Sequence, residues 1–121
     1  MPKIVLVDDC KLTLTIARDI LEGAGYEVQT AESGIEANRH VFATPRPALV
    51  MMDIEMPLLS GDRVVRFFRE RESTRDLPIL LMSNKSSDEL ARLVRESGAD
   101  GYIKKPLHPE SLLKAIRQLL V

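Results

Sequence analysis

Residues 48–53 read Ala-Leu-Val-Met-Met-Asp, an apolar run that stops at a carboxylate. Residues 4–9 follow the same pattern as Ile-Val-Leu-Val-Asp-Asp, and residues 78–83 as Pro-Ile-Leu-Leu-Met-Ser. A short apolar run that ends at a polar residue is typical of a strand buried on both faces. These three segments therefore predict the centre of a parallel sheet that helices cover on both sides.

Amphipathic segments separate these runs, with apolar residues at the spacing of one helix face. Two further strands are expected at residues 26–31 and 102–103, and helices at residues 12–22, 33–45, 61–71, 87–97 and 109–120. Ser87-Asp88 is expected to cap the fourth helix. Five strands alternating with five helices predict an α/β fold, a single doubly wound (βα)5 domain, because crossovers between parallel strands are right-handed. A closed eight-fold barrel would need about twice this length.

The whole chain, residues 1–121, is expected to form one domain, because single domains cluster at roughly 100–150 residues. Its formal net charge of −1 argues against nucleic-acid binding and membrane-surface binding, which need a basic excess. The single cysteine, Cys10, excludes an internal disulfide and a cysteine-rich zinc site. The apolar runs fall short of the roughly 20 residues that span a bilayer, and the N-terminus lacks a signal-peptide pattern, so a cytoplasmic location without membrane insertion is expected.

Polar residues stand where the predicted strands end. These are Asp8, Asp9, Asp53 and Ser83, together with Lys104 and Lys105 after the last strand. The carboxyl ends of parallel strands share one edge of the sheet, where open α/β proteins bind their ligands. Taken singly, each residue has a structural interpretation as a helix cap, a turn former or a solvated lysine. Their common location at one edge favours a functional site, and the chain contains no glycine-rich nucleotide-binding loop.

The order and spacing of these residues resemble the receiver domains of two-component response regulators, of the CheY-like type. The resemblance covers residues 4–120. It rests on Leu6-Val7-Asp8-Asp9, on Asp53-Ile54-Glu55-Met56-Pro57 followed by Gly61, on Ser83, on Gly98-Ala99-Asp100-Gly101-Tyr102 and on Lys105-Pro106. It implies a five-stranded parallel sheet in the order 2-1-3-4-5.

The resemblance also implies a reaction and a cofactor. Asp53 would accept a phosphoryl group from a phosphohistidine on a sensor histidine kinase or a histidine phosphotransfer protein. The cofactor would be Mg²⁺, and its protein ligands would be Asp9 directly, Asp8 through water, Asp53, and Glu55 through its backbone carbonyl. This allocation agrees with the oxygen ligands and retained waters that Mg²⁺ prefers.

A cation and a hydroxyl group complete the implied site. Lys105 would add positive charge at the phosphoryl group, and strand alternation places Lys105 rather than Lys104 on the side of the site. Ser83 would bind a phosphoryl oxygen while Tyr102 changes rotamer. This switch would remodel the face of the fourth helix, fifth strand and fifth helix, which would contact a downstream protein. Tyr102 has a structural alternative as a half-buried aromatic residue.

Two side chains at the mouth of the site are implied to tune the lifetime of the acyl phosphate. They are Glu55 and Lys85, which stand two residues after Asp53 and Ser83 respectively. They could pair with each other, or face solvent without a role. Cys10 is expected to be a small residue buried at an edge, not a redox switch. The charged stretch 69–76 is expected to be a solvated helix end.

Together these features predict a phosphorylation-switched signalling receiver. It would assist only its own phosphorylation and dephosphorylation, so it would not be an enzyme acting on a separate substrate. The alternative is a docking module of the same fold that works without phosphorylation. Such receivers usually lose an acidic residue, the lysine or the phosphoacceptor, and this chain has them all. An aspartyl-phosphate phosphatase would need Asp-x-Asp at the first strand and a cap domain, and neither is present.

Overall fold

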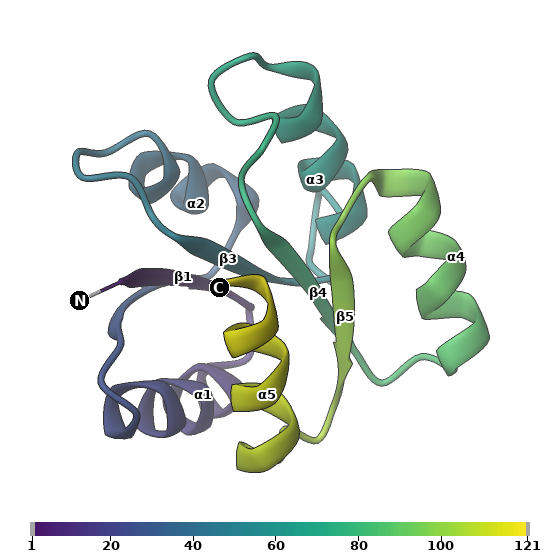
Figure 1. Ribbon diagram of the computed structural model, residues 1–121. Coiled ribbons are helices and arrows are strands. Elements are labelled where there is room, and N and C mark those ends of the chain that lie inside the picture. Colours follow the sequence, from purple (N-terminus) through teal and green to yellow (C-terminus); the bar gives the residue numbers. More distant parts are fainter. Residues whose placement is uncertain (1, 121) are drawn as a thin grey trace.

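The computed structural model describes residues 2–120. At the centre of this part of the chain is one sheet of five parallel strands in the order β2-β1-β3-β4-β5 (Figure 1). The strands are β1 (Lys3–Val7), β2 (Glu27–Ala31), β3 (Leu49–Asp53), β4 (Ile79–Ser83) and β5 (Gly101–Lys104). The predicted fold class, the parallel sheet and the strand order are confirmed.

Within the same residues, five helices cover the two faces of the sheet. They are α1 (Lys11–Gly23), α2 (Gly34–Val41), α3 (Gly61–Glu70), α4 (Ser87–Ser97) and α5 (Pro109–Leu119). Helices α1 and α5 pack on one face, and α2, α3 and α4 pack on the other (Figure 1). None of these helices has the length and apolar character that crossing a bilayer requires.

The core lies in two layers because neighbouring residues of a strand point to opposite faces. In β1, Val5 and Val7 belong to the layer under α2, α3 and α4, whereas Ile4 and Leu6 belong to the layer under α1 and α5. All residues of β1, β3 and β4 are buried. Burying one such aliphatic side chain contributes roughly 1.5–3 kcal/mol, so these strands form a stable platform for the polar residues at their ends.

One helix end and one helix cap differ clearly from the expectation, whereas the other helix ends agree with it to within one residue. Helix α2 ends at Val41 and not at residue 45. Proline lacks an N–H donor and disfavours helix in the residue before it, so Pro45 and Pro47 prevent the helix from continuing. Helix α4 is capped one residue earlier than expected, because the Ser86 hydroxyl accepts a hydrogen bond from the Glu89 N–H at 3.2 Å.

Cys10 is exposed, so the expectation that it is buried at an edge is wrong. It occupies the N-cap position of α1, where the chain turns away from the end of β1. Asp8 is buried and Asp9 is exposed, so the chain reaches solvent before Cys10. Hydrogen bonding to Thr13 lowers the pKa of the exposed thiol.

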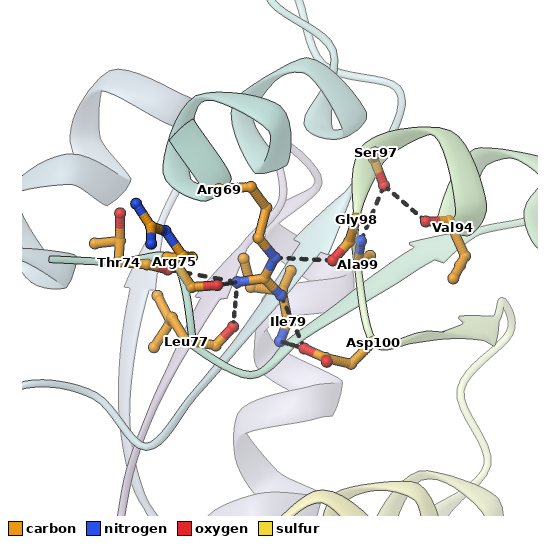
Figure 2. Close-up of polar contacts among 10 residues, drawn as sticks. All are labelled: Arg69, Thr74, Arg75, Leu77, Ile79, Val94, Ser97, Gly98, Ala99 and Asp100. Atoms are coloured by element: carbon orange, nitrogen blue, oxygen red, sulfur yellow. Dashed lines mark hydrogen bonds and ion pairs between the residues drawn. The ribbon is translucent and has the colours of Figure 1, made fainter. Parts of the chain in front are cut away.

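Arg69, near the end of α3, is held in a hydrogen-bond network, so the expectation of a solvated helix end is wrong for this residue (Figure 2). Its side chain is 17% exposed. The guanidinium donates to the carbonyl oxygens of Gly98 at 2.8 Å, Arg75 at 3.0 Å and Leu77 at 2.6 Å, and to Asp100 Oδ2 at 2.9 Å. The five N–H donors of arginine suit it to carbonyl groups that loops leave unpaired.

This network joins two loops at the edge of the sheet where β4 begins. Asp100 also accepts a hydrogen bond from the Ile79 N–H at 2.8 Å (Figure 2). Thr74 is buried, and its hydroxyl donates to the Phe68 carbonyl at 2.6 Å. The stretch after α3 therefore carries structural contacts, which lie at the opposite end of the strands from the polar residues predicted to form a site.

Candidate functional site

Three carboxylates meet at the carboxyl ends of β1 and β3. Asp53 is the last residue of β3, and Asp8 and Asp9 directly follow β1, its neighbour in the sheet. One carboxylate oxygen of each residue lies within 4.8 Å of those of the other two. Asp8 is 0% and Asp53 2% exposed, whereas Asp9 reaches solvent. The structure thus brings the three predicted carboxylates together. Without a cation nearby, the buried carboxylates of Asp8 and Asp53 would repel each other.

Lys105 supplies a positive charge between the two buried carboxylates. Its Nζ donates a hydrogen bond to Asp53 Oδ1 at 2.9 Å and lies 2.7 Å from Asp8 Oδ2. The residue directly follows β5, and its backbone N–H donates to the Ser83 carbonyl at 2.9 Å. Lys104 is exposed and Lys105 reaches the site, as strand alternation predicts.

The two oxygens of Asp8 have different surroundings. Oδ1 accepts a hydrogen bond from the Cys10 N–H at 2.9 Å, which orients the carboxylate. Oδ2 is buried and lies 2.7 Å from Lys105 Nζ, so the ammonium group is its partner among the described residues. This buried oxygen therefore already faces a cation, as an oxygen ligand of a metal ion would.

Burial changes the titration of both charged partners. Desolvation raises the pKa of Asp53 to about 6; the hydrogen bond from Lys105 opposes this shift, and the negative charge of Asp8 adds to it. For Lys105, burial acts to lower the pKa, but hydrogen bonds and attraction from Asp8 and Asp53 outweigh it and the pKa is raised. Lys105 is therefore a cation at neutral pH, and Asp53 is a carboxylate of unusual basicity.

Ser83 and Glu55 contact each other beside the carboxylates. The Ser83 hydroxyl donates to Glu55 Oε1 at 2.6 Å and Oε2 at 3.1 Å, and it accepts the Lys85 backbone N–H at 3.0 Å. Lys85 Nζ lies 4.0 Å from Glu55 Oε1 and 3.5 Å from Glu89 Oε1. Glu55 and Lys85 therefore form an ion pair, one of the two arrangements that the sequence left open. Lys85 also forms an ion pair with Glu89 of α4.

Glycine at position 61 allows the loop after β3 to fold back onto Asp53. A methyl group at Gly61 would overlap the backbone carbonyl oxygen of Asp53 and press on Met52. The Gly61 N–H donates to the Ile54 carbonyl at 2.9 Å, which closes the loop that carries Glu55. This close approach requires a residue without a side chain at the start of α3.

Tyr102 lies on β5 opposite Leu81 of β4. Its side chain is half-buried against the core layer under α2, α3 and α4, in agreement with its structural interpretation. Among the described residues, the hydrogen bonds of the Ser83 hydroxyl are with Glu55 and Lys85 and not with Tyr102. The two residues predicted to switch together are therefore on neighbouring strands without a direct hydrogen bond.

A pocket of about 250 Å³ opens at this edge of the sheet. Its lining residues are Asp8, Asp9, Cys10, Asp53, Glu55, Asn84 and Lys105. Cys10 and Asn84 have no functional role in the predictions from sequence. The signal that identifies them is their position, directly after the polar residues that end β1 and β4.

The chain is similar to known response regulators. It is 29% identical over 121 residues to the polar-differentiation response regulator DivK of Brucella anthropi, an alignment that covers 99% of this chain and 98% of that protein. Among solved structures, the chemotaxis response regulator CheY4 of Vibrio cholerae is 32% identical, with a TM-score of 0.90 and 99% of both chains covered.

A further solved structure is the receiver domain of the sensor histidine kinase PA1611 from Pseudomonas aeruginosa PAO1. It is 25% identical with a TM-score of 0.88, covers 98% of this chain and 97% of that chain, and has a magnesium ion coordinated in its active site cleft. Residues 4–117 match the response regulator receiver domain. Fold, acidic pocket and similarity agree: this chain belongs to the response regulator receiver family, and it is CheY-like in structure and DivK-like in sequence.

Proposed function

We propose that this chain is a phosphorylation-switched signalling receiver, a single domain over residues 1–121, in which Asp53 accepts a phosphoryl group. The chain would act in the cytoplasm, and the donor would be a phosphohistidine on a sensor histidine kinase or a histidine phosphotransfer protein. The observation that carries this proposal is the Lys105 ammonium group, 2.9 Å from the Asp53 carboxylate and 2.7 Å from Asp8. A carboxylate beside a fixed cation can attack phosphorus while the cation neutralises charge on the transferred group.

The transfer conserves atoms and charge. An Asp53 oxygen attacks the phosphorus atom of phosphohistidine, a P–O bond forms, the P–N bond breaks, and the imidazole nitrogen leaves with the electron pair and is protonated. Phosphorylated Asp53 is a mixed anhydride that water hydrolyses to the carboxylate and inorganic phosphate, which returns the chain to its starting state. The chain would assist both steps on itself, so we propose a signalling module and not an enzyme with a separate substrate.

The acidic cluster fits a Mg²⁺ ion, which prefers oxygen ligands. The carboxylates of Asp8, Asp9 and Asp53 converge within 4.8 Å, and Asp9 reaches solvent beside the two buried ones. These three residues and the backbone carbonyl of Glu55 would hold the ion. The magnesium in the Pseudomonas receiver supports this assignment. When bound, the ion would supply positive charge to the phosphoryl oxygens.

Ser83 and Tyr102 are the proposed switch residues. Ser83 is fully buried at the end of β4, the strand next to the one that ends at Asp53. Its hydroxyl would exchange Glu55 for a phosphoryl oxygen, and Tyr102 on the adjacent β5 would change rotamer. This movement would remodel the face of α4, β5 and α5, where a downstream protein would bind. Glu55 and Lys85 border the site and would tune the lifetime of the phosphorylated form.

Intact mass spectrometry after incubation with acetyl phosphate and Mg²⁺ tests this function. We expect one acid-stable, base-labile phosphoryl group per chain, absent in Asp53→Asn and absent when EDTA removes the metal. Asp19→Asn, which changes an exposed carboxylate on α1, is the matched control and should be phosphorylated normally. If no adduct forms, and beryllofluoride also fails to bind, the mechanism is overturned. The chain would then be a receiver-fold docking module that works without phosphorylation.

A further inference from the structure

Five of the seven large hydrophobic side chains that are exposed in the described residues lie on α2, on α3 or in the loops next to them. The large hydrophobic residues that are exposed are Leu12, Ile16, Ile35, Phe42, Leu58, Leu59 and Phe67. Leu12 and Ile16 belong to α1, and the others lie on α2, on α3 or in the loops next to them. In residues 2–120 none lies on α4, β5 or α5. Apolar residues that gather on one surface indicate an interaction site, whereas scattered ones do not.

A groove of about 260 Å³ lies between α2 and α3. Gly34 and the buried Val64 form its floor, and its walls include Ile35, Leu59 and Phe67. These wall residues are 79%, 41% and 37% exposed respectively, so the groove is apolar and open to solvent. A methyl group at Gly34 would come within 2.8 Å of Val64 Cγ2, so the floor is already closely packed.

Leu58, beside the groove, has a backbone conformation that is unusual for leucine. Its φ is 71°, in the left-handed region, and its side chain is fully exposed. This conformation costs free energy for a residue with a bulky side chain, and the exposed leucine gains nothing from burial within this chain. Both features suit a side chain that a partner buries.

Positive charge borders this groove. Arg63 lines it, and neither Arg63 nor Arg71 forms an ion pair with an acidic residue in the described part of the chain. The Arg71 guanidinium lies 4.2 Å from the centroid of the Phe67 ring, at the groove wall. Within residues 2–120 no acidic side chain lines the groove, so the charge at its lining is positive, in a chain whose net charge is −1.

We propose that the α2–α3 groove is a docking site for an amphipathic helix of a partner protein, with an apolar stripe flanked by acidic residues. Side chains at i, i+3 or i+4 and i+7 of that helix would lie against Ile35, Leu59 and Phe67. Acidic flanks would pair with Arg63 and Arg71. The groove is smaller than the roughly 300–1,000 Å³ typical of small-molecule pockets, which favours the side chains of a protein as its occupant.

The shape of the groove also separates this proposal from two others. A concave groove between two helices fits the convex surface of a helix and does not fit a flat bilayer. The groove shares no lining residue with the pocket that contains Asp53, so the proposal does not depend on phosphoryl transfer. A partner bound here would leave both Asp53 and the face of α4, β5 and α5 accessible.

The probe is a fluorescent peptide of about 18 residues, long enough to form a helix, with leucine at the stated spacing and glutamate at most other positions. The matched control peptide has lysine in place of glutamate. Fluorescence anisotropy would measure affinity, and amide chemical shifts of the ¹⁵N-labelled chain would locate the site. We expect saturable, salt-sensitive binding of the glutamate peptide only, with shifts confined to α2, α3 and the loop at Leu59.

Variants of exposed residues test the groove without disturbing the core. Ile35→Ser removes an apolar wall, and Arg63→Glu reverses the charge at the groove lining; each should weaken binding at least about tenfold. Leu12→Ser is the matched control, because Leu12 is 68% exposed on α1 and should not affect affinity. Phosphorylation of Asp53 should be unchanged in all three variants, so a failure of docking is distinguishable from a failure of phosphoryl transfer.

Several results would overturn the proposal. Equal affinity for the lysine peptide would show that the charge of the groove plays no part in binding. Unchanged affinity of Ile35→Ser, or chemical-shift changes on α1 or α4, would show that the peptide does not bind in the groove. Binding to phosphatidylglycerol vesicles that is lost in Ile35→Ser would assign the surface to a membrane. Self-association in sedimentation that is lost in Ile35→Ser would assign it to a second copy of this chain.

Discussion

The Ser83 hydroxyl donates a hydrogen bond to the Glu55 carboxylate, with oxygen–oxygen distances of 2.6 and 3.1 Å. A serine hydroxyl has one hydrogen to donate. Ser83 therefore cannot donate to a phosphoryl oxygen on Asp53 while it donates to Glu55. If Ser83 is the switch residue, Glu55, two residues after the proposed phosphoacceptor Asp53, holds it in the unphosphorylated arrangement.

We predict that the Glu55→Ala variant is phosphorylated faster than the wild-type chain. The substitution frees the Ser83 hydroxyl, and it removes a negative charge that would repel a phosphodonor approaching Asp53. A change of about 1.4 kcal/mol in the barrier would give a tenfold increase in the initial rate. Intact mass spectrometry at early times of reaction with acetyl phosphate and Mg²⁺ measures it. The backbone carbonyl of Glu55 remains available to the metal.

Glu89→Ala is the control for this experiment, because it removes a second partner of Lys85 and leaves the contact between Ser83 and Glu55 in place. Its phosphorylation rate should match that of the wild-type chain. Equal rates for Glu55→Ala and the wild-type chain would show that the hydrogen bond does not restrain Ser83.

Asp53 is predicted to destabilise the metal-free chain at neutral pH. Its pKa is raised from 3.8 to about 6, so between these pH values the folded chain retains a proton that the unfolded chain has lost. The free energy of unfolding should therefore fall as the pH rises through this window. Asp53→Asn should be more stable than the wild-type chain at about pH 8, by at most about 3 kcal/mol, and the difference should vanish below about pH 4.

Urea unfolding in EDTA at a series of pH values measures this difference. Asp19→Asn, an exposed carboxylate on α1, is expected to show no comparable dependence on pH. A wild-type chain that is as stable as Asp53→Asn at about pH 8 would contradict the prediction, since the ionised carboxylate would then carry no cost of burial.

Gly61→Ala is predicted to destabilise the fold and to slow phosphorylation. The added methyl group would overlap the Asp53 carbonyl oxygen, so the loop after β3 would have to move. Overpacking of this kind costs typically 1–3 kcal/mol. Urea unfolding and the phosphorylation rate would be measured together, because the same loop carries Glu55.

Gly23→Ala provides the matched comparison, because a methyl group at Gly23, at the end of α1, would meet no atom within 4 Å. This variant should be as stable as the wild-type chain or slightly more stable, since alanine favours helix over glycine by roughly 1 kcal/mol. A Gly61→Ala chain with wild-type stability would mean that the loop can move without cost.

Arg69→Lys is predicted to lower the free energy of unfolding by about 2–3 kcal/mol, because lysine cannot reproduce the planar set of donors that binds four loop carbonyls and Asp100. Arg66→Lys, an exposed position on the same helix, should change stability by less than about 0.5 kcal/mol. Phosphorylation of folded Arg69→Lys should proceed at the wild-type rate, because the network lies at the opposite end of the strands. A slowed rate would indicate coupling between the two ends.

The order of the elements and the place of the acidic pocket could be predicted from the sequence. Continuous apolar runs need burial on both faces, and β1, β3 and β4 are buried throughout. Parallel strands end at a common edge, so the polar residues that follow the apolar runs had to converge. Lys105 reaches both Asp8 and Asp53 for this reason. Lys105 was distinguished from Lys104 by its position before Pro106 and three residues after Tyr102, and by strand alternation, which turns Lys104 to the opposite side.

The partners of individual polar side chains were decided only by the tertiary structure. Arg69 and Asp100 are separated by 31 positions in the sequence, and Glu55 and Ser83 by 28. The alternating charges of residues 69–76 are the same in sequence whether Arg69 is solvated or binds carbonyl groups, because the charge pattern does not specify the path of the loops that carry those carbonyls. The sequence determines which segments bury their faces, through periodicity and hydrophobicity. A hydrogen bond requires donor and acceptor within about 3 Å, and only the folded loops decide which groups come so close.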